Sequence, residues 1–419
     1  MSQSYDVTIV SAWGRGQGLS ARLAELGFKV ALVDVSDNLG RWTPTDWEGP
    51  IGYFQGSSLT QSQVERLTED EYLDPVEEGF SLWLKNGPRD FKGPLSGYWS
   101  GKFSQLVGST QYLGSYLQLE PSESESIKSY LTEKDYSENW IVNLAHQLSA
   151  TTYKENIEGL SFGRPLPLMS DYYIRRTSRR GYKKSLDWCE QKGVKLFSGA
   201  QLEDIRIEGN SCTALEIKSD WSGAISSDQF IWMLSSEETK FASQKVAKVL
   251  YPQGELKSMW SWLKFGVQLS ENEASLTLPM KFVLIEDLNL PWTHLNMCLM
   301  QRSEQSSQYD VWMKVPTQQR FSKDYLDKLF VDLKTVLENR IPGTEVSLWT
   351  MPQDYLYNYE DLGPSPFVQF NEEQRDDWKS LDLGNLTYKG PEHSQSWDWT
   401  GQMFEHREIL NSFRAKDVE

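Results

Sequence analysis

Residues Tyr5 to Trp42 read YDVTIVSAWGRGQGLSARLAELGFKVALVDVSDNLGRW, and this stretch decides the fold. An apolar run at 7–10 ends in a glycine-rich turn. Leucines 19, 23 and 26 then recur at helical spacing before Gly27, where a C-terminal cap glycine belongs. A second apolar run at 30–33 ends in Asp34. The order strand, glycine turn, helix, strand and acid predicts a β-α-β unit of the kind that binds a dinucleotide.

The glycine fingerprint of this unit can be aligned in two ways. Counting back from Asp34 puts the third glycine at Gly16 and leaves Ser11 and Trp13 where the first two glycines belong. The other register reads a compressed G-x-G-x-G at Gly14, Gly16 and Gly18, and it shortens the helix by about half a turn. In the first register an indole would lie where a pyrophosphate approaches the backbone. The sequence therefore leaves open a bound dinucleotide and a β-α-β fold that has lost its ligand.

Composition limits the classes of partner. The 419 residues suffice for two or three domains, with ordinary contents of 39% hydrophobic and 24% charged residues. A net charge of −17 argues against nucleic acid and anionic membrane surfaces. Cysteines 189, 212 and 298 lack metal-ligand spacing, so no metal site is expected. The N-terminus does not resemble a secretory leader, and no apolar run reaches the length of about 18 residues that a membrane span needs. We therefore expect a cytoplasmic protein.

The remaining chain supplies two further groups of elements. A basic, amphipathic helix that contains Arg175 and Arg176 and ends near Gly193 is followed by expected strands at 194–197, 202–207, 213–217 and 228–233. The next part of the chain predicts strands at 262–269, 280–285, 295–300 and 309–315. It also contains the clearest helix, at 322–339. The C-terminal segment is again strand, glycine turn, acid and helix: a strand at 385–388, then Gly390-Pro391-Glu392, then a helix from Thr400.

Three segments together resemble the FAD-dependent amine oxidase and phytoene desaturase superfamily, whose cofactor domain has the glutathione-reductase-type fold. The first is 6–42, which ends in Leu39-Gly40-Arg41-Trp42 where the family usually has Gly-Gly-Arg. The second is GYKKSLDWCEQKGVKLFSGAQLEDIRIEGNSCTALEI with the later SSDQFIWML, and the third is NLTYKGPEHSQSWDWTGQM. The resemblance covers the cofactor half of the chain.

This resemblance implies an α/β protein with a Rossmann-like FAD- or NAD(P)-binding domain and a second, α+β substrate domain with a mixed or antiparallel sheet. We expect the cofactor domain at 1–95, 172–240 and 352–419, and the substrate or cap domain at 96–171 and 241–351. Asp34 would bind the adenosine ribose and the Leu202 backbone would face the adenine. The other cofactor-binding positions implied are Ser11, Trp13, Gly14, Gly16, Gly18, Gly40, Arg41, Glu392, Gly401, Gln402 and Met403.

Two classes of function follow from the resemblance. The first is an FAD-dependent oxidoreductase that abstracts hydride from a C–N or C–C bond of an apolar or amine-bearing small molecule, with Lys264 as the candidate lysine near the flavin. The second is a flavin-free binding or escort protein on the same fold, with a protein partner, which Ser11 and Trp13 favour. An NAD(P)-dependent dehydrogenase that uses the first unit alone is a third interpretation, but it leaves the C-terminal segment without a role.

Overall fold

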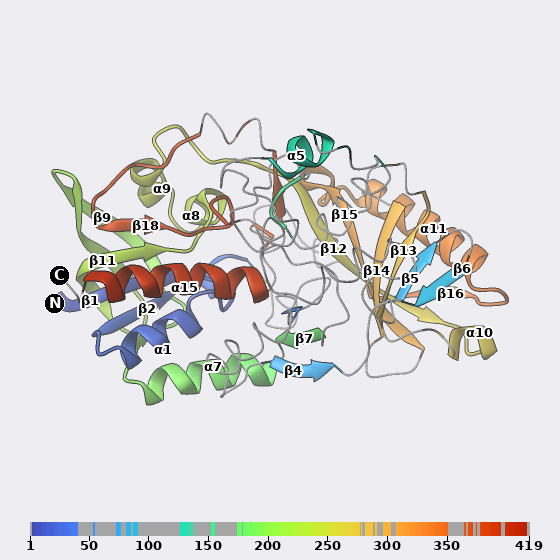
Figure 1. Ribbon diagram of the computed structural model, residues 1–419, viewed down its shortest axis with the longest axis horizontal. Helices are drawn as coiled ribbons and strands as arrows, with labels where there is room; N and C mark the ends of the chain where they lie inside the picture. Colours follow the sequence, from blue (N-terminus) through green and yellow to red (C-terminus); the bar gives the residue numbers. More distant parts are fainter. Residues whose placement is uncertain are drawn as a thin grey trace.

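A computed structural model describes residues 2–40, 179–276, 307–350, 378–394 and 399–416, together with shorter stretches between them. The described residues form two large β-sheets that lie at opposite ends of the longest axis of the molecule (Figure 1). A small three-stranded sheet, of β3 (Tyr53–Phe54), β7 (Ile174–Thr177) and β4 (Leu73–Val76), lies between them.

The first sheet has the order β8-β2-β1-β11-β10-β9, with β18 beside β11. Its strands are β1 (Ser2–Ser11), β2 (Val30–Asp34), β8 (Lys195–Phe197), β9 (Gln201–Glu208), β10 (Ser211–Lys218), β11 (Ser222–Trp232) and β18 (Leu386–Tyr388). Strand β1 runs parallel to β2 and β11, and β18 runs parallel to β11, whereas β9 and β10 are antiparallel. The segments that follow β1, β2, β11 and β18 therefore leave the sheet at one edge, where parallel α/β sheets bind their ligands.

Strand β1 carries apolar side chains on both sides, and helices cover both faces of the sheet. Val7 and Ile9 pack with α1 (Gln17–Glu25), α7 (Arg179–Gln191) and α15 (Trp399–Lys416), which lie together in Figure 1. Val10 faces the opposite core, which includes α9 (Gln244–Leu250) and lies near α8 (Ser236–Ala242). Such alternation along a strand buried on both faces explains the continuous apolar run in the sequence.

The second sheet has the order β16-β12-β15-β14-β13-β5-β6, with β17 beside β12. Its strands are β5 (Ser81–Leu84), β6 (Gly87–Asp90), β12 (Ser258–Leu269), β13 (Lys281–Ile285), β14 (Met297–Arg302), β15 (Gln308–Pro316), β16 (Val346–Thr350) and β17 (Val368–Phe370). The long helix α11 (Lys323–Arg340) packs its buried leucines on one face. Shorter described elements are α5 (Ile127–Glu133), α10 (Glu273–Leu276) and the 3-10 turns η1 (Ser36–Asn38) and η5 (Thr317–Gln319).

The predicted α/β fold is confirmed, and most expected elements form within a few residues of their predicted positions. Ser322 is the N-cap of α11, as its sequence position predicts: its hydroxyl accepts a hydrogen bond from the Tyr325 backbone N–H. The basic segment needs a correction, because Arg175 and Arg176 lie in β7 and the helix begins only at Arg179. Residues 81–90 and 368–370 supply strands to the second sheet, although the expected boundaries assigned them to the cofactor domain.

Two findings concern the part of the chain that the structure describes. No helix in the described part of the chain is both long and apolar enough to span a membrane. The described histidines, cysteines and carboxylates form no group that could hold a metal ion.

Candidate functional site

The turn between β1 and α1 decides between the two glycine registers. Helix α1 begins at Gln17 with Gly16 as its N-cap, so Gly18 lies inside the helix. A Cβ on Gly16 would come within 2.8 Å of Ser11 Cβ, which explains why a glycine is needed where the helix meets the strand. The structure therefore follows the first register, in which Ser11 and Trp13 replace the first two glycines.

Trp13 has a backbone conformation that usually requires glycine. Its φ is +59°, next to Gly14 at +75°, and its backbone N–H donates to the Ser36 hydroxyl at 2.9 Å. A bulky residue at positive φ is uncommon and is maintained only where its surroundings hold it. The side chain is 7% exposed, so the packing of the indole provides that support.

One carboxylate oxygen holds both large side chains of this turn. Glu238 Oε1, from the first turn of α8, accepts a hydrogen bond from Trp13 Nε1 at 2.8 Å and forms an ion pair with Arg15 Nη2 at 2.5 Å. Glu238 Oε2 accepts from the Ser235 backbone N–H at 2.7 Å, which completes a capping box at the start of α8. Arg15 and Glu238 are 6% and 1% exposed. We call Trp13, Arg15 and Glu238 the turn lock.

Arg15 keeps its positive charge in this ion pair. Burial by itself lowers the pKa of Arg15, but the charge and hydrogen bond of Glu238, together with the charges of Tyr153 and Glu392, outweigh this effect and the pKa is raised overall. Both oxygens of Glu238 already accept hydrogen bonds. Neither oxygen is therefore left for a ligand, whereas Arg15 Nη1 is buried without a hydrogen-bond partner.

Asp34 lies where an adenosine ribose would be bound. It ends β2 opposite Ser11 in the parallel ladder, and its Oδ1 accepts from the Ser36 backbone N–H at 2.8 Å. Its Oδ2 is buried without a hydrogen bond, and burial raises the pKa of the carboxyl. The Ala200 N–H donates to the Asp34 carbonyl at 2.9 Å, so the start of β9 lies beside it. Leu202 itself is buried in the core and paired with Ile217.

The C-terminal segment reaches the same edge of the sheet. Glu392 is 1% exposed, and its Oε1 accepts from the Ser236 backbone N–H at 2.6 Å while its Oε2 has no hydrogen bond. Burial raises the pKa of this carboxyl to about 8. The acid that would bind a ribityl hydroxyl instead contacts the start of α8. A Cβ on Gly390 would lie 2.3 Å from the Leu234 carbonyl oxygen, so this turn packs tightly on the end of β11.

Helix α15 closes the site from the other side. Gly401, Gln402 and Met403 lie in its first turns, and His406 Nε2 lies 2.9 Å from the Arg15 carbonyl oxygen. Burial lowers the pKa of His406 to about 4. Gly40 has φ +104°, and Arg41 lies outside the described residues.

A cavity of about 20 Å³ lies between the first turn and the C-terminal segment, with walls that include Arg15, Met233 and Pro391. A ligand pocket usually has about 300–1,000 Å³. Asp34, with its unbonded Oδ2, suits the ribose end of FAD, whereas the turn lock and Glu392 lie at the two turns to which the resemblance assigns the diphosphate and the ribityl chain. The described residues do not fit FAD in this arrangement.

Lys264 lies in the second sheet and not in this cleft. It is half-buried in β12, and its Nζ is 5.8 Å from the centre of the Trp312 ring. The sequence by itself did not point to Arg15 or Glu238 as part of the site. The Ser-x-x-Glu pattern from Ser235 to Glu238, directly after a strand, is the signal that could have drawn attention to the glutamate.

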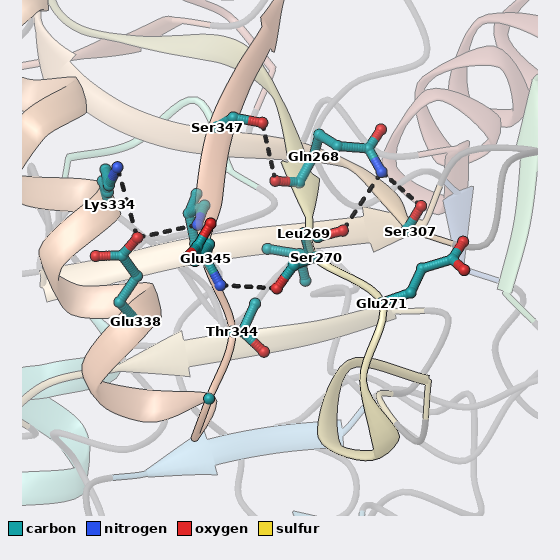
Figure 2. Close-up of a pocket in the computed structure, with 12 residues that line it drawn as sticks. Gln268, Leu269, Ser270, Glu271, Ser307, Lys334, Glu338, Thr344, Glu345 and Ser347 are labelled. Atoms are coloured by element: carbon teal, nitrogen blue, oxygen red, sulfur yellow. Dashed lines mark hydrogen bonds and ion pairs between the residues drawn. The ribbon is translucent and has the colours of Figure 1, made fainter.

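A second hollow lies at the far end of the second sheet (Figure 2). It measures about 860 Å³ and lies between the end of β12, the start of β16 and the last turns of α11. Its polar groups largely bond one another: the Glu345 N–H donates to Ser270 at 2.8 Å, and Glu338 accepts from the Val346 N–H at 3.0 Å. Its walls carry three glutamates and one lysine, Lys334, which pairs with Glu338. The hollow is therefore a polar surface groove between the ends of two strands.

Comparison with solved structures identifies the fold. An oxidoreductase from Methanosarcina mazei matches 98% of this chain and 100% of its own, with a TM-score of 0.57 and 13% identity. Wild-type putrescine oxidase bound to putrescine matches 99% and 100%, with a TM-score of 0.56 and 11% identity. A triple mutant of that enzyme gives a TM-score of 0.59. No family model and no curated protein matches the chain.

The chain therefore shares its fold with this oxidoreductase and with putrescine oxidase over nearly its whole length. The fold expected from the three sequence segments is confirmed. At 11–13% identity the likeness establishes architecture alone.

Proposed function

We propose that this chain is a binding protein that keeps the fold of FAD-dependent oxidoreductases without binding FAD. The observation that carries the proposal is the turn lock, in which Trp13 and Arg15 share one oxygen of Glu238. A dinucleotide diphosphate needs small residues and free backbone N–H groups at this turn. Here an indole and a guanidinium fill the turn, and a carboxylate that would repel a diphosphate lies against them.

The energetic cost of opening the turn supports the same conclusion. A diphosphate could enter only if Trp13 and Arg15 moved away from Glu238, which would leave a buried carboxylate without its partner. Removing one partner of a buried ion pair costs about 3–5 kcal/mol. Since 1.4 kcal/mol is a factor of ten, FAD affinity would fall by roughly two to four orders of magnitude.

The direct test is the flavin content of the purified protein. We expect no flavin absorption bands, and no saturable change in flavin fluorescence when FAD is added. Stoichiometric flavin in the purified protein, or saturable FAD binding at micromolar concentration, would overturn the proposal.

A gain-of-function variant makes the test sharper. The triple substitution Trp13→Gly, Arg15→Ala and Glu238→Ala removes the whole turn lock together, so no buried charge is left unpaired. We expect this variant to acquire measurable FAD binding, and the further change Asp34→Asn to weaken it again. Circular dichroism of each variant checks that the fold is retained.

An FAD-dependent oxidoreductase acting on a C–N or C–C bond is the second candidate. The fold match over nearly the whole chain and the unbonded Oδ2 of Asp34 favour it. Oxygen consumption with added FAD and putrescine, or another primary amine, tests this candidate. Turnover that disappears in a Lys264→Met variant would favour it over the binding protein.

A further inference from the structure

We infer that Glu392 is a pH-sensitive latch, which holds residues 389–394 over Arg15 while its carboxyl is neutral and releases them when the carboxyl ionises. We call residues 389–394 the strap. The inference rests on the proposed function, because it names what regulates access to the turn that the turn lock fills. A neutral carboxyl suits a buried position, whereas an unpaired charged one does not.

The strap is attached to the first sheet and to α8 by short polar contacts. The Lys389 N–H donates to the Trp232 carbonyl oxygen, at the end of β11, at 2.7 Å. Three residues further on, Glu392 Oε1 accepts from the Ser236 N–H, at the start of α8, at 2.6 Å. The Glu392 side chain therefore joins the strap to the helix that also carries Glu238.

The charges around Glu392 favour the neutral form of its carboxyl. Its side chain is almost completely buried, and Oε2 has no hydrogen bond. Glu238 acts on it as a like charge and Arg15 as an opposite charge, but Arg15 is already paired with Glu238 at 2.5 Å. Ionisation of Glu392 would add a second negative charge to a buried space that holds one guanidinium, and this costs several kcal/mol when the charge has no partner of its own.

The other charged neighbours do not supply a free counter-charge. Lys389 of the strap forms ion pairs with Glu405 and Glu408 of α15, at 2.5 and 3.0 Å. His406, also on α15, is neutral at pH 7 because burial lowers its pKa to about 4. The two cations of this region, Lys389 and Arg15, therefore already have carboxylate partners.

The aromatic neighbours of the latch are neutral as well. Burial raises the pKa of Tyr251, and the charge of Glu392 raises it further. Burial also raises the pKa of Tyr388 above its ordinary value, and the ring of Tyr388 stacks on that of His393 in the strap, with centres 5.6 Å apart. These groups pack beside the strap without compensating an ionised Glu392.

Release of the strap would uncover the guanidinium of the turn lock. Arg15 lines the cavity of about 20 Å³ together with Pro391 and Ser394 of the strap. Its Nη1 is buried without a hydrogen-bond partner. Once the strap moves away, this donor can meet water or the anionic group of a ligand. The charge of one carboxyl thereby controls access to Arg15.

The direction of the pH effect follows from proton linkage. The pKa of Glu392 is raised from 4.5 to about 8 while the strap is closed, and exposure to solvent returns it to its ordinary value. The closed form therefore keeps a proton that the released form loses, so release becomes about tenfold more favourable per pH unit between the two pKa values. His406 has the opposite effect, but only below its ordinary pKa of 6.5. The range from about pH 6.5 to 8 thus isolates Glu392 from His406.

Hydrogen–deuterium exchange of the full chain measures the release. Protection factors, which are corrected for the intrinsic pH dependence of exchange, are compared at about pH 6.5 and about pH 8. We expect the protection of the Lys389 and Ser394 amides to fall about tenfold, and these amides to exchange faster than the buried amides of α11 because release is local. No fall in the strap, or exchange as slow as that of α11, would overturn the inference.

Two variants assign the effect to Glu392. Glu392→Gln stays neutral at every pH, so its strap should show the same protection at both pH values. Glu345→Gln, at an exposed position in the groove of Figure 2, is the matched control and should keep the native pH dependence. A fall in Glu392→Gln as large as in the native protein would refute the latch.

A second measurement needs no variant. Infrared difference spectra of the native protein between about pH 6.5 and about pH 8 should show the loss of a protonated carboxyl band, as the pKa of Glu392 requires. Absence of such a band would overturn the inference even if Glu392→Gln failed to fold. Neither experiment contains FAD, so failure here is distinguishable from failure of the proposed function.

Discussion

Replacing Glu238 with glutamine should destabilise the protein strongly, because it leaves the Arg15 guanidinium buried beside a neutral group. The amide oxygen of glutamine can still accept from Trp13 Nε1, but its NH2 group cannot accept from the Ser235 N–H, so the substitution removes the charge and one capping hydrogen bond. Arg15 and Glu238 are 6% and 1% exposed, so solvent cannot replace the lost partner. Breaking a buried ion pair from one side costs about 3–5 kcal/mol. We expect a loss within this range, about 3–5 kcal/mol, because the charge and one capping hydrogen bond are lost together.

Urea unfolding followed by tryptophan fluorescence measures this loss. The control is Glu255→Gln, which breaks the surface pair between Lys240 and Glu255, whose side chains are 48% and 20% exposed. Exposed pairs contribute about 0–1 kcal/mol, so the control should remain close to the native protein.

A double variant separates charge from packing. Arg15→Met together with Glu238→Gln removes the uncompensated charge and should recover part of the stability lost by Glu238→Gln alone. If Glu238→Gln lost no more stability than Glu255→Gln, the turn lock could not be what closes the cleft.

Three further predictions follow from the same region. The pKa of Glu392 is raised from 4.5 to about 8, so the folded state holds this proton more tightly, and stability should fall as pH rises from about 5 to 8; Glu392→Gln should abolish that slope in unfolding titrations. The pKa of His406 is lowered from 6.5 to about 4, so its contribution should be lost as pH falls from about 6.5 to 4, and His406→Gln should be less sensitive over that range. Gly390→Ala should cost about 1–3 kcal/mol by overpacking against a carbonyl oxygen 2.3 Å away, whereas Gly384→Ala, whose nearest neighbour would be at 3.6 Å, should cost little; equal thermal shifts for the two would contradict this.

Periodicity and local chemistry in the sequence determined the architecture. The apolar run before the first turn, the leucines of α1 and Asp34 predicted the β-α-β unit, because strands buried on both faces and amphipathic helices leave strong patterns. Ser322 predicted the start of α11 for the same reason, since a cap acts within one helical turn. The likeness of three distant segments to one superfamily predicted the fold of the cofactor half of the chain, and the match to solved structures extends over nearly its whole length.

The tertiary structure alone decided the state of the cleft. The sequence placed a tryptophan where glycine belongs, but it could not say what the indole would contact. Its partner, Glu238, lies 225 residues further along the chain, at the start of a short helix. The register of β12 against β15 likewise brings Trp262 opposite Lys314, two residues that lie 52 positions apart in the sequence. Contacts between distant residues arise when strands pair and helices pack, so they leave no periodic signal in the sequence.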